Sequence, residues 1–164
     1  KGLARGMLRS YLARPASSGE VVAVEEPFAL ELTEALPQVE GRIDLIERTG
    51  DGGCVLTDYK TARSRRTPSP DQLVLYREAA ARLGLADAER LRVRYVLLLK
   101  TASADVQVVE VPVGPADLER LISTYVSAWR EIERGCSFPR TGWWCEGCQW
   151  AQHCDSHPGG LGGA

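Results

Sequence analysis

Apolar and polar positions follow two different spacings along the chain, and these divide most of it into predicted strands and helices. Strand-like runs predict β-strands at residues 21–32, 39–47, 54–61, 91–100 and 106–113. Apolar residues near helical spacing predict helices at residues 2–14, 71–83 and 115–134. The segment 91–100 is nearly all apolar, which is typical of a strand inside a sheet rather than at its edge.

Turn and breaker residues indicate how some of these segments lie. The stretch from Thr49 to Gly53 is a strong hairpin signal, so we expect strands 39–47 and 54–61 to pair antiparallel. Pro27 lacks an N–H donor and therefore predicts an edge position or a bulge in segment 21–32. The last helix carries an apolar stripe that we expect to face the core, made of Leu118, Leu121, Ile122, Tyr125, Trp129 and Ile132.

Composition limits the classes of protein that fit. The chain has 164 residues, of which 44% are apolar and 26% charged, as in a soluble globular domain with its own core. Its net charge of −2 excludes a globally basic nucleic-acid binder, so any DNA contact must come from a local patch. We see no apolar run near the ~20 residues of a membrane span, and no signal peptide. Because the sequence begins at Lys1 within a predicted helix, we expect a piece of a longer protein.

Two carboxylates and a lysine stand out on the predicted hairpin. Asp58 and Lys60 alternate with Tyr59 and therefore point to one face of their strand, and Asp44 on the paired strand can reach the same face. Two adjacent carboxylates resist joint ionisation unless a hard cation such as Mg²⁺ or Mn²⁺ lies between them. Such a cation lowers the pKa of a bound water and stabilises charge on a phosphate, and the lysine can orient the water. The pattern alone is also typical of an exposed ion pair.

The surrounding sequence favours the metal site. Residues 41–47, the glycine-rich turn, residues 55–61 and residues 72–76 together resemble the RecB-like nucleases of the PD-(D/E)xK superfamily in order, spacing and predicted structure. Residues 24–28 resemble the strand that leads into this run. With the cysteine-rich tail described below, the resemblance spans nearly the whole chain.

The resemblance implies a fold and a set of roles. The fold is α/β, restriction-endonuclease-like, with a mixed central β-sheet flanked by helices. Asp44 and Asp58 would be metal ligands, with the Tyr59 carbonyl a further candidate, and Lys60 would be the catalytic lysine. Gln72 and Tyr76 match the Gln-x-x-x-Tyr motif of the family and, at i and i+4, share a helix face that could contact DNA near the scissile phosphate.

One part of the family pattern is missing. Many RecB-like nucleases carry a metal-binding histidine on a helix before the first strand. The histidines of this chain are His153 and His157, both in the tail, and the predicted helix 2–14 has none. Either that histidine precedes Lys1 in a longer protein, or this copy lacks it and its nuclease activity is in doubt.

Four of the five cysteines lie near the end of the chain, and Cys54 lies apart in a predicted strand. The odd, clustered count favours a metal site in a reducing compartment, and hence the cytoplasm, over a disulfide scaffold. Cys145, Cys148 and Cys154 form C-x₂-C-x₅-C, which resembles the last three ligands of the 4Fe–4S cluster in iron–sulfur RecB-like nucleases such as the AddB type. The fourth ligand would precede Lys1 or be Cys136.

The alternative is a Zn²⁺ knuckle made of these three cysteines and Cys136, since sulfur ligation suits both metals. Under either reading the centre is a structural staple, and Trp143, Trp144 and Trp150 are expected to shield it and pack it onto the domain. We therefore predict a nuclease core at 1–134, a cysteine-rich tail at 135–157 and a flexible glycine-rich end at 158–164.

Arginines supply the candidate DNA-binding patch. Arg63, Arg65 and Arg66 directly follow the strand that bears Asp58, and their guanidinium groups suit phosphate, although a solvated loop would look the same. The leading hypothesis is a Mg²⁺- or Mn²⁺-dependent deoxyribonuclease acting on single-stranded DNA or unwound duplex ends with a helicase domain or subunit. The alternatives are a nuclease-inactive DNA-binding or scaffold module, and a zinc-ribbon interaction domain without nuclease ancestry.

Overall fold

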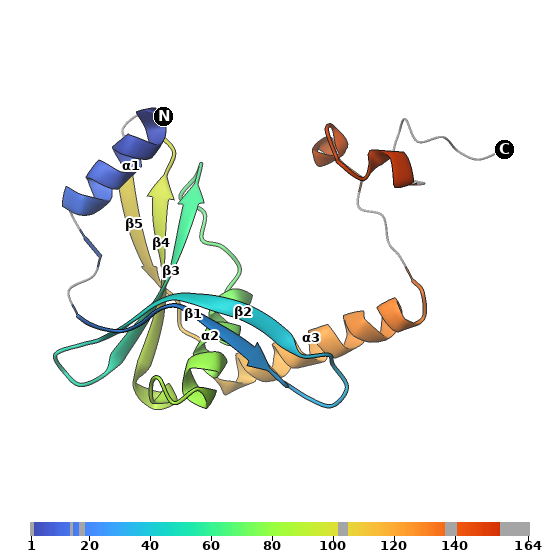
Figure 1. Cartoon of the computed structure of the whole chain (residues 1–164), viewed down its shortest axis with the longest axis horizontal. Coiled ribbons are helices and arrows are strands. Elements are labelled where there is room, and N and C mark those ends of the chain that lie inside the picture. Colours follow the sequence, from blue (N-terminus) through green and yellow to red (C-terminus); the bar gives the residue numbers. More distant parts are fainter. Residues whose placement is uncertain (1, 14, 17–18, 102–104, 137–140, 155–164) are drawn as a thin grey trace. The chain divides into compact units, whose positions relative to one another are not determined.

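The computed structural model describes residues 2–13, 15–16, 19–101, 105–136 and 141–154. The chain divides into two compact units, Lys1–Val126 and Ser127–Ala164, and the division falls within the last helix, α3 (Pro115–Glu133) (Figure 1). The predicted domain limits at 134 and 157 stay predictions, and the glycine-rich end at 158–164 lies outside the described residues. Within the described ranges, no helix has both the length and the apolar character needed to cross a membrane.

The first unit is built on a mixed five-stranded sheet in the order β1-β2-β3-β4-β5. Neighbouring strands pair antiparallel except β3 and β4, which are parallel and are joined through helix α2 (Asp71–Arg82) and a short 3₁₀ helix, Ala88–Arg90. The strands are β1 (Glu20–Leu30), β2 (Val39–Arg48), β3 (Cys54–Ala62), β4 (Leu91–Leu99) and β5 (Asp105–Glu110). The predicted α/β fold with a mixed sheet flanked by helices is confirmed.

The hairpin between β2 and β3 forms where the sequence predicts it. Gly52 has a φ of +76°, a left-handed conformation that glycine adopts without strain, and its N–H donates to the Thr49 carbonyl at 2.9 Å. This tight turn sets the antiparallel register from Arg48 opposite Cys54 to Leu45 opposite Thr57. The turn therefore determines which residues of the two strands face each other.

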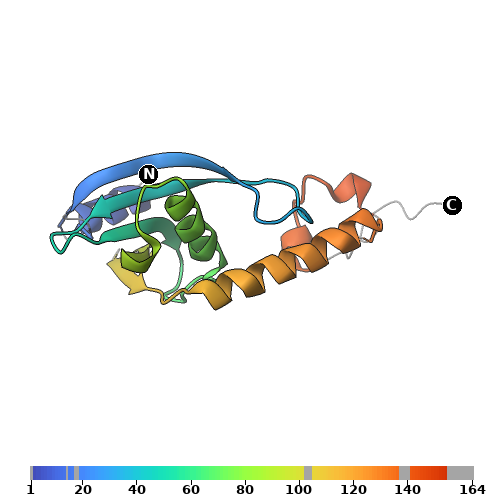
Figure 2. The same ribbon diagram turned by 90° about the horizontal axis from the view of Figure 1, so that it is seen from below.

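Helices cover both faces of the sheet. Helix α1 (Gly2–Ala13) contacts β4 and β5, and α2 contacts β1, β3 and β4. Tyr59 on β3 contacts α1, and because side chains alternate along a strand, Asp58 points to the opposite face, where Leu56 packs in one apolar core with α2. Figures 1 and 2 show β1 and β2 as a long pair that extends beyond the other three strands.

The core explains most of the predicted apolar pattern and corrects one part of it. β4 is an interior strand and Pro27 lies in the edge strand β1, as predicted. In α3, Leu121 is buried, and Leu118, Ile122 and Tyr125 pack partly buried against the core. The prediction that Ile132 faces the core is wrong, since its side chain is 58% exposed. The core of the first unit reaches α3 only over residues before the division at 126, whereas Ile132 belongs to the last turn, in the second unit.

The second unit contains the end of α3 and two short 3₁₀ helices, Trp143–Cys145 and Ala151–His153. Among its aromatic side chains, Trp143 is 81% exposed and Trp150 65% exposed, while the rings of Trp143 and Trp144 meet edge to face with centroids 5.8 Å apart. The predicted packing of the three tryptophans around a metal stays a prediction.

Candidate active site

The two strands that bear the aspartates separate at the point where these residues would face each other. The β2–β3 ladder reaches Leu45 opposite Thr57, and one step further the Asp44 carboxylate takes the place of a main-chain carbonyl. Its Oδ2 accepts a hydrogen bond from the Tyr59 N–H at 2.8 Å. Beyond this point β2 continues against β1 and β3 against β4. The fork therefore holds the Asp44 side chain across from Asp58.

Asp58 and Lys60 point to the same face of β3 and form an ion pair. The Lys60 Nζ lies 3.1 Å from Asp58 Oδ1, to which it donates a hydrogen bond, and 2.9 Å from Oδ2. The Asp58 side chain is 1% exposed, whereas that of Lys60 is 35% exposed. The lysine therefore lies between a buried carboxylate and solvent, where a substrate phosphate could reach it.

Burial raises the pKa of Asp58 above its usual value of 3.8. The hydrogen bond and the charge of Lys60 oppose this shift, and the negative charge of Asp44 adds to it. The direction shows that the protein around Asp58 does not fully compensate its charge, even with the lysine in contact. A further positive charge at this site would favour the ionised form.

The donor atoms fit a hard divalent cation. Asp58 Oδ2 is buried and accepts no hydrogen bond from the described residues, although Lys60 Nζ is near it in a poor geometry for one. Asp44 presents a second carboxylate, one oxygen of which is held by the Tyr59 N–H. Carboxylate oxygens are the ligands that Mg²⁺ and Mn²⁺ prefer. Across the described ranges, no group of three His, Cys, Asp or Glu side chains converges, so the carboxylate set here consists of two.

The predicted pair on α2 forms as expected from its i, i+4 spacing. Gln72 Nε2 donates to the Tyr76 hydroxyl at 2.6 Å. Burial raises the pKa of Tyr76, and the charges of Asp58 and Asp44 raise it further. The hydrogen bond from Gln72 opposes this shift. The hydroxyl of Tyr76 therefore lies within electrostatic reach of both aspartates, on the face of the sheet that carries Lys60.

A buried polar layer on the opposite face of the sheet was missed from the sequence. The hydroxyls of Tyr11 and Tyr59 are 2.7 Å apart, and Arg94 donates from Nε to Thr57 Oγ1 at 2.8 Å. The Arg94 guanidinium also pairs with Glu47 at 3.4 Å, and the two side chains are 12% and 3% exposed. This layer lies beneath the strand that carries Asp58 and Lys60. In the sequence, this layer is indicated only by polar residues at inward-facing positions of three mostly apolar strands, namely Glu47, Thr57 and Arg94.

The three loop arginines are exposed. Arg65 pairs with Asp105 at the start of β5, and Arg63 and Arg66 also lie on the surface. The loop follows β3 directly, so it leaves the same end of the sheet as the aspartate–lysine pair. Their role in binding DNA stays a prediction.

The tail cysteines form a local turn within the second unit. The Cys148 N–H donates to the Cys145 carbonyl at 3.1 Å, and Gly147 between them has a φ of +76°. Cys145, Cys148 and Cys154 are half-buried, Cys136 is exposed, and none of the four forms a disulfide. In the part of the chain that the structure describes, these thiols do not converge as one metal group, so the cluster and the zinc alternative stay predictions.

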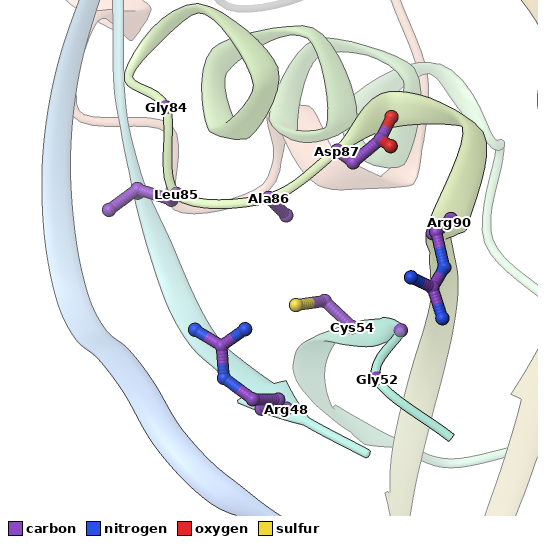
Figure 3. Close-up of a pocket in the computed structure, with 9 residues that line it drawn as sticks. Arg48, Gly52, Cys54, Gly84, Leu85, Ala86, Asp87 and Arg90 are labelled. Atoms are coloured by element: carbon purple, nitrogen blue, oxygen red, sulfur yellow. The ribbon is translucent and has the colours of Figure 1, made fainter. Parts of the chain in front are cut away.

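A separate hollow of about 230 Å³ lies at the other end of β3, where Cys54 begins the strand. Figure 3 shows the Cys54 sulfur and the Arg48 guanidinium turned toward it, with Arg90 at its edge. The residues that line it include none of the predicted catalytic residues. It is therefore distinct from the fork that holds Asp44 and Asp58.

Comparison with known proteins identifies the family. The family model described as the PD-(D/E)XK nuclease superfamily matches residues 1–155. The chain belongs to the PD-(D/E)XK nuclease superfamily. This membership excludes the reading as a zinc-ribbon domain without nuclease ancestry. Among curated proteins, none matches the sequence.

Two solved structures share the architecture of this chain at low sequence identity. The crystal structure of SSO0001 aligns with a TM-score of 0.53 and 18% identity, covering 95% of this chain and 69% of that one. A protein from Eubacterium rectale, provisionally described as an exonuclease, aligns with a TM-score of 0.51 and 13% identity. That alignment covers 93% of this chain and 58% of the Eubacterium protein, so the chain spans little more than half of its length. At these identities the likeness concerns the fold.

Proposed function

We propose that the chain is a Mg²⁺- or Mn²⁺-dependent deoxyribonuclease of the RecB type, which hydrolyses phosphodiester bonds in DNA repair or recombination. It would act as an exonuclease domain or as the nuclease module of a helicase–nuclease. The observation that carries the proposal is the buried Asp58, with Lys60 Nζ 2.9 Å from its unbonded oxygen and Asp44 held across the strand fork. Membership of the superfamily supports the reaction class.

The two aspartates are the residues that would hold the cation, with the Tyr59 carbonyl as a further ligand. When bound, the cation lowers the pKa of a water and offsets negative charge on the phosphate. Asp44 is oriented for this role because the Tyr59 N–H holds one of its oxygens. Asp58 contributes a carboxylate whose full charge the protein alone does not compensate, since burial raises its pKa.

Lys60 and the α2 pair act on the substrate. The Lys60 ammonium, already 2.9–3.1 Å from both Asp58 oxygens, is positioned to donate to the attacking water and to offset the charge that develops on the phosphate. Gln72 holds the Tyr76 hydroxyl, which can then donate to a phosphate oxygen of the same strand. Arg63, Arg65 and Arg66 would bind the phosphates that follow.

For the tail we propose a 4Fe–4S cluster held by Cys145, Cys148 and Cys154, with Cys136 or a residue outside this chain as the fourth ligand. Zn²⁺ is the alternative metal. The turn from Cys145 to Cys148 supports either choice, because its main-chain hydrogen bond closes the tight knuckle that two thiolates need to bind one metal centre. The centre would stabilise the tail and take no part in hydrolysis.

A second candidate function is a nuclease-inactive module that binds DNA or serves as a scaffold. The observation in its favour is that only two carboxylates meet at the fork, with no histidine beside them among the described residues. Such a site would bind the cation weakly, because fewer charged ligands lower the affinity.

The Lys60→Ala variant tests the nuclease assignment. With end-labelled single-stranded and duplex DNA and Mn²⁺ or Mg²⁺, we expect the wild-type chain to cleave and the variant to lose roughly 100-fold or more in rate. Lys100→Ala is the matched control, since Lys100 is an exposed lysine at the end of β4.

Each outcome separates the two candidates. A Lys60→Ala variant with full cleavage overturns the assigned site. A wild-type chain that binds DNA in a mobility-shift assay, yet leaves it intact with Mn²⁺, decides for the inactive module.

A further inference from the structure

A hollow of about 560 Å³ adjoins the candidate active site, and of the residues that line it the hydrolysis proposed above uses only Gln72 and Tyr76. Aromatic side chains from four elements line it, namely Phe28 of β1, Tyr76 of α2, Tyr95 of β4 and Tyr125 of α3. All four belong to the first unit. The volume lies within the roughly 300–1,000 Å³ of pockets that bind small organic groups.

The hollow and the active site share residues of α2. Tyr76 belongs to both, and Tyr95 lies directly opposite Asp58 in the β3–β4 register. Burial raises the pKa of Tyr95 to about 12, and the charge of Asp58 is the next cause. A DNA strand with one phosphate at Asp58 and Lys60 would therefore place a neighbouring nucleotide at this hollow.

The charges around the hollow select for a base rather than a phosphate. Glu40 and Asp71 lie at its wall, and the described residues that line it include no lysine or arginine. The hollow in Figure 3 differs, because Arg48 and Arg90 line it together with Asp87. A phosphate would be repelled by the two carboxylates, whereas the exocyclic amino group of a base can donate to them.

The aromatic wall is held in place before any ligand binds. The Phe28 and Tyr76 rings meet edge to face with centroids 5.6 Å apart, and the Tyr95 hydroxyl donates to the Ser69 carbonyl at 2.7 Å. Tyr125 is half-buried, and burial and the charge of Asp71 both raise its pKa. Tyr125 and Asp71, the carboxylate that would accept from a base, both line the hollow. Aromatic rings are the platforms on which proteins stack the bases of single strands.

We propose that this hollow binds one unstacked nucleobase of the DNA strand held at the active site, with Tyr125 stacking on the base and Asp71 accepting from its amino group. The inference rests on the proposed function, because it takes DNA as the ligand. It restricts the substrate to single strands or frayed ends, since a base within a duplex stays stacked and paired. It also predicts a preference for cytosine over thymine, which has no exocyclic amino group.

The test compares Tyr125→Ala with the wild-type chain on two single strands of equal length, one of cytosines and one with every base removed. Binding is measured by fluorescence anisotropy in Ca²⁺, with the strands checked to remain intact. We expect the variant to bind the cytosine strand about fivefold or more weakly and the abasic strand as well as the wild type does. Tyr125→Phe should bind the cytosine strand as tightly as the wild type does, because it keeps the ring. Val108→Ala, at an exposed position of β5, should leave the affinity for both strands unchanged.

The outcomes distinguish this proposal from the nuclease assignment. Equal losses on both strands, or no loss on either, overturn the base site while leaving Mn²⁺-dependent cleavage as a separate result. A base-dependent loss in a chain that does not cleave supports the hollow and removes only the hydrolysis. A third strand of the same length, made of thymines, tests the contact with Asp71: equal affinity of the wild type for the cytosine and thymine strands overturns that contact. Circular dichroism and the thermal midpoint show whether Tyr125→Ala is folded.

Discussion

The Asp44 carboxylate accepts a hydrogen bond from the Tyr59 N–H at 2.8 Å, at the point where β2 and β3 stop pairing. The same side chain therefore closes the end of the strand ladder and presents a free face to the candidate metal site. The contact gives Asp44 a structural role and a proposed catalytic role, and these two roles can be separated by substitution. It also means that losing activity on removal of Asp44 would not, by itself, identify a metal ligand.

Asp44→Asn and Asp44→Ala separate the two roles. The amide oxygen of asparagine can still accept from the Tyr59 N–H, so we expect Asp44→Asn to keep the unfolding free energy within about 0.5 kcal/mol of wild type, while cleavage is lost with the charge. Asp44→Ala leaves that N–H without its acceptor and should cost about 1–3 kcal/mol as well. Urea unfolding and cleavage of labelled DNA measure the two effects. Equal stability of the two variants would contradict the structural role.

The raised pKa of Asp58 predicts how stability depends on pH in the absence of metal. A carboxyl whose pKa is higher in the folded than in the unfolded state contributes stability in full at a pH below its unfolded-state pKa. This contribution is lost as the pH rises through its folded-state pKa. We therefore expect the wild-type unfolding free energy to fall, relative to Asp58→Asn, as pH rises from about 4 in the presence of EDTA. The decline should end once the pH exceeds the raised pKa, because Asp58 is then ionised in both states.

Added Mg²⁺ or Mn²⁺ should reverse this trend in the wild type alone. A cation that binds the folded state raises stability by mass action, and Asp58→Asn removes one of its two carboxylates. Thermal unfolding with and without the cation at neutral pH measures how much the cation stabilises the wild type and Asp58→Asn.

The metal-free prediction has its own contradicting result. A wild type whose stability relative to Asp58→Asn rises with pH in EDTA would contradict the direction of the pKa shift.

The sequence was sufficient for the fork but not for what lies beneath it. A tight turn between Thr49 and Gly53 and the two-residue period of strands place Asp44 across from Asp58 with no knowledge of the rest of the fold. Gln72 and Tyr76 meet because residues at i and i+4 share a helix face. Each of these relationships depends on a short stretch of chain, so local pattern determines it.

The buried polar layer depends on contacts between distant residues. Tyr11 and Tyr59 are 48 positions apart, and Arg94 and Glu47 are 47 apart on strands that do not pair with each other. The Arg94–Glu47 pair requires the parallel register of β3 and β4, and the Tyr11–Tyr59 contact requires α1 to pack on the sheet. No hairpin sets either arrangement, and local pattern does not encode them. The same limit applies to Ile132, because the apolar stripe of α3 continues past the end of the core that it packs against.

Because the Arg94–Glu47 pair is buried, we expect replacement of Arg94 to destabilise the fold far more than replacement of Arg92 on the same strand. Arg94→Met removes the guanidinium that pairs with Glu47, whose side chain is 3% exposed, and we expect a loss of about 3–5 kcal/mol in urea unfolding. Arg92 is the matched control, since its pair with Glu110 is 54% and 61% exposed, and Arg92→Met should cost less than about 1 kcal/mol. Combining Arg94→Met with Glu47→Leu should recover part of the loss. Equal losses for the two single variants would contradict the buried pair.

The cysteine tail makes a prediction that metal analysis can decide. After purification without oxygen, we expect the wild-type chain to carry iron and acid-labile sulfide, and Cys148→Ser to lose both, because the thiolates hold the cluster. Cys54→Ala is the control, since Cys54 is buried at the start of β3 in the first unit. Zinc without sulfide would support the alternative metal, and neither metal in the wild type would overturn both. Cys136→Ser tests the fourth ligand: retained iron shows that the ligand lies elsewhere, and lost iron assigns it to Cys136.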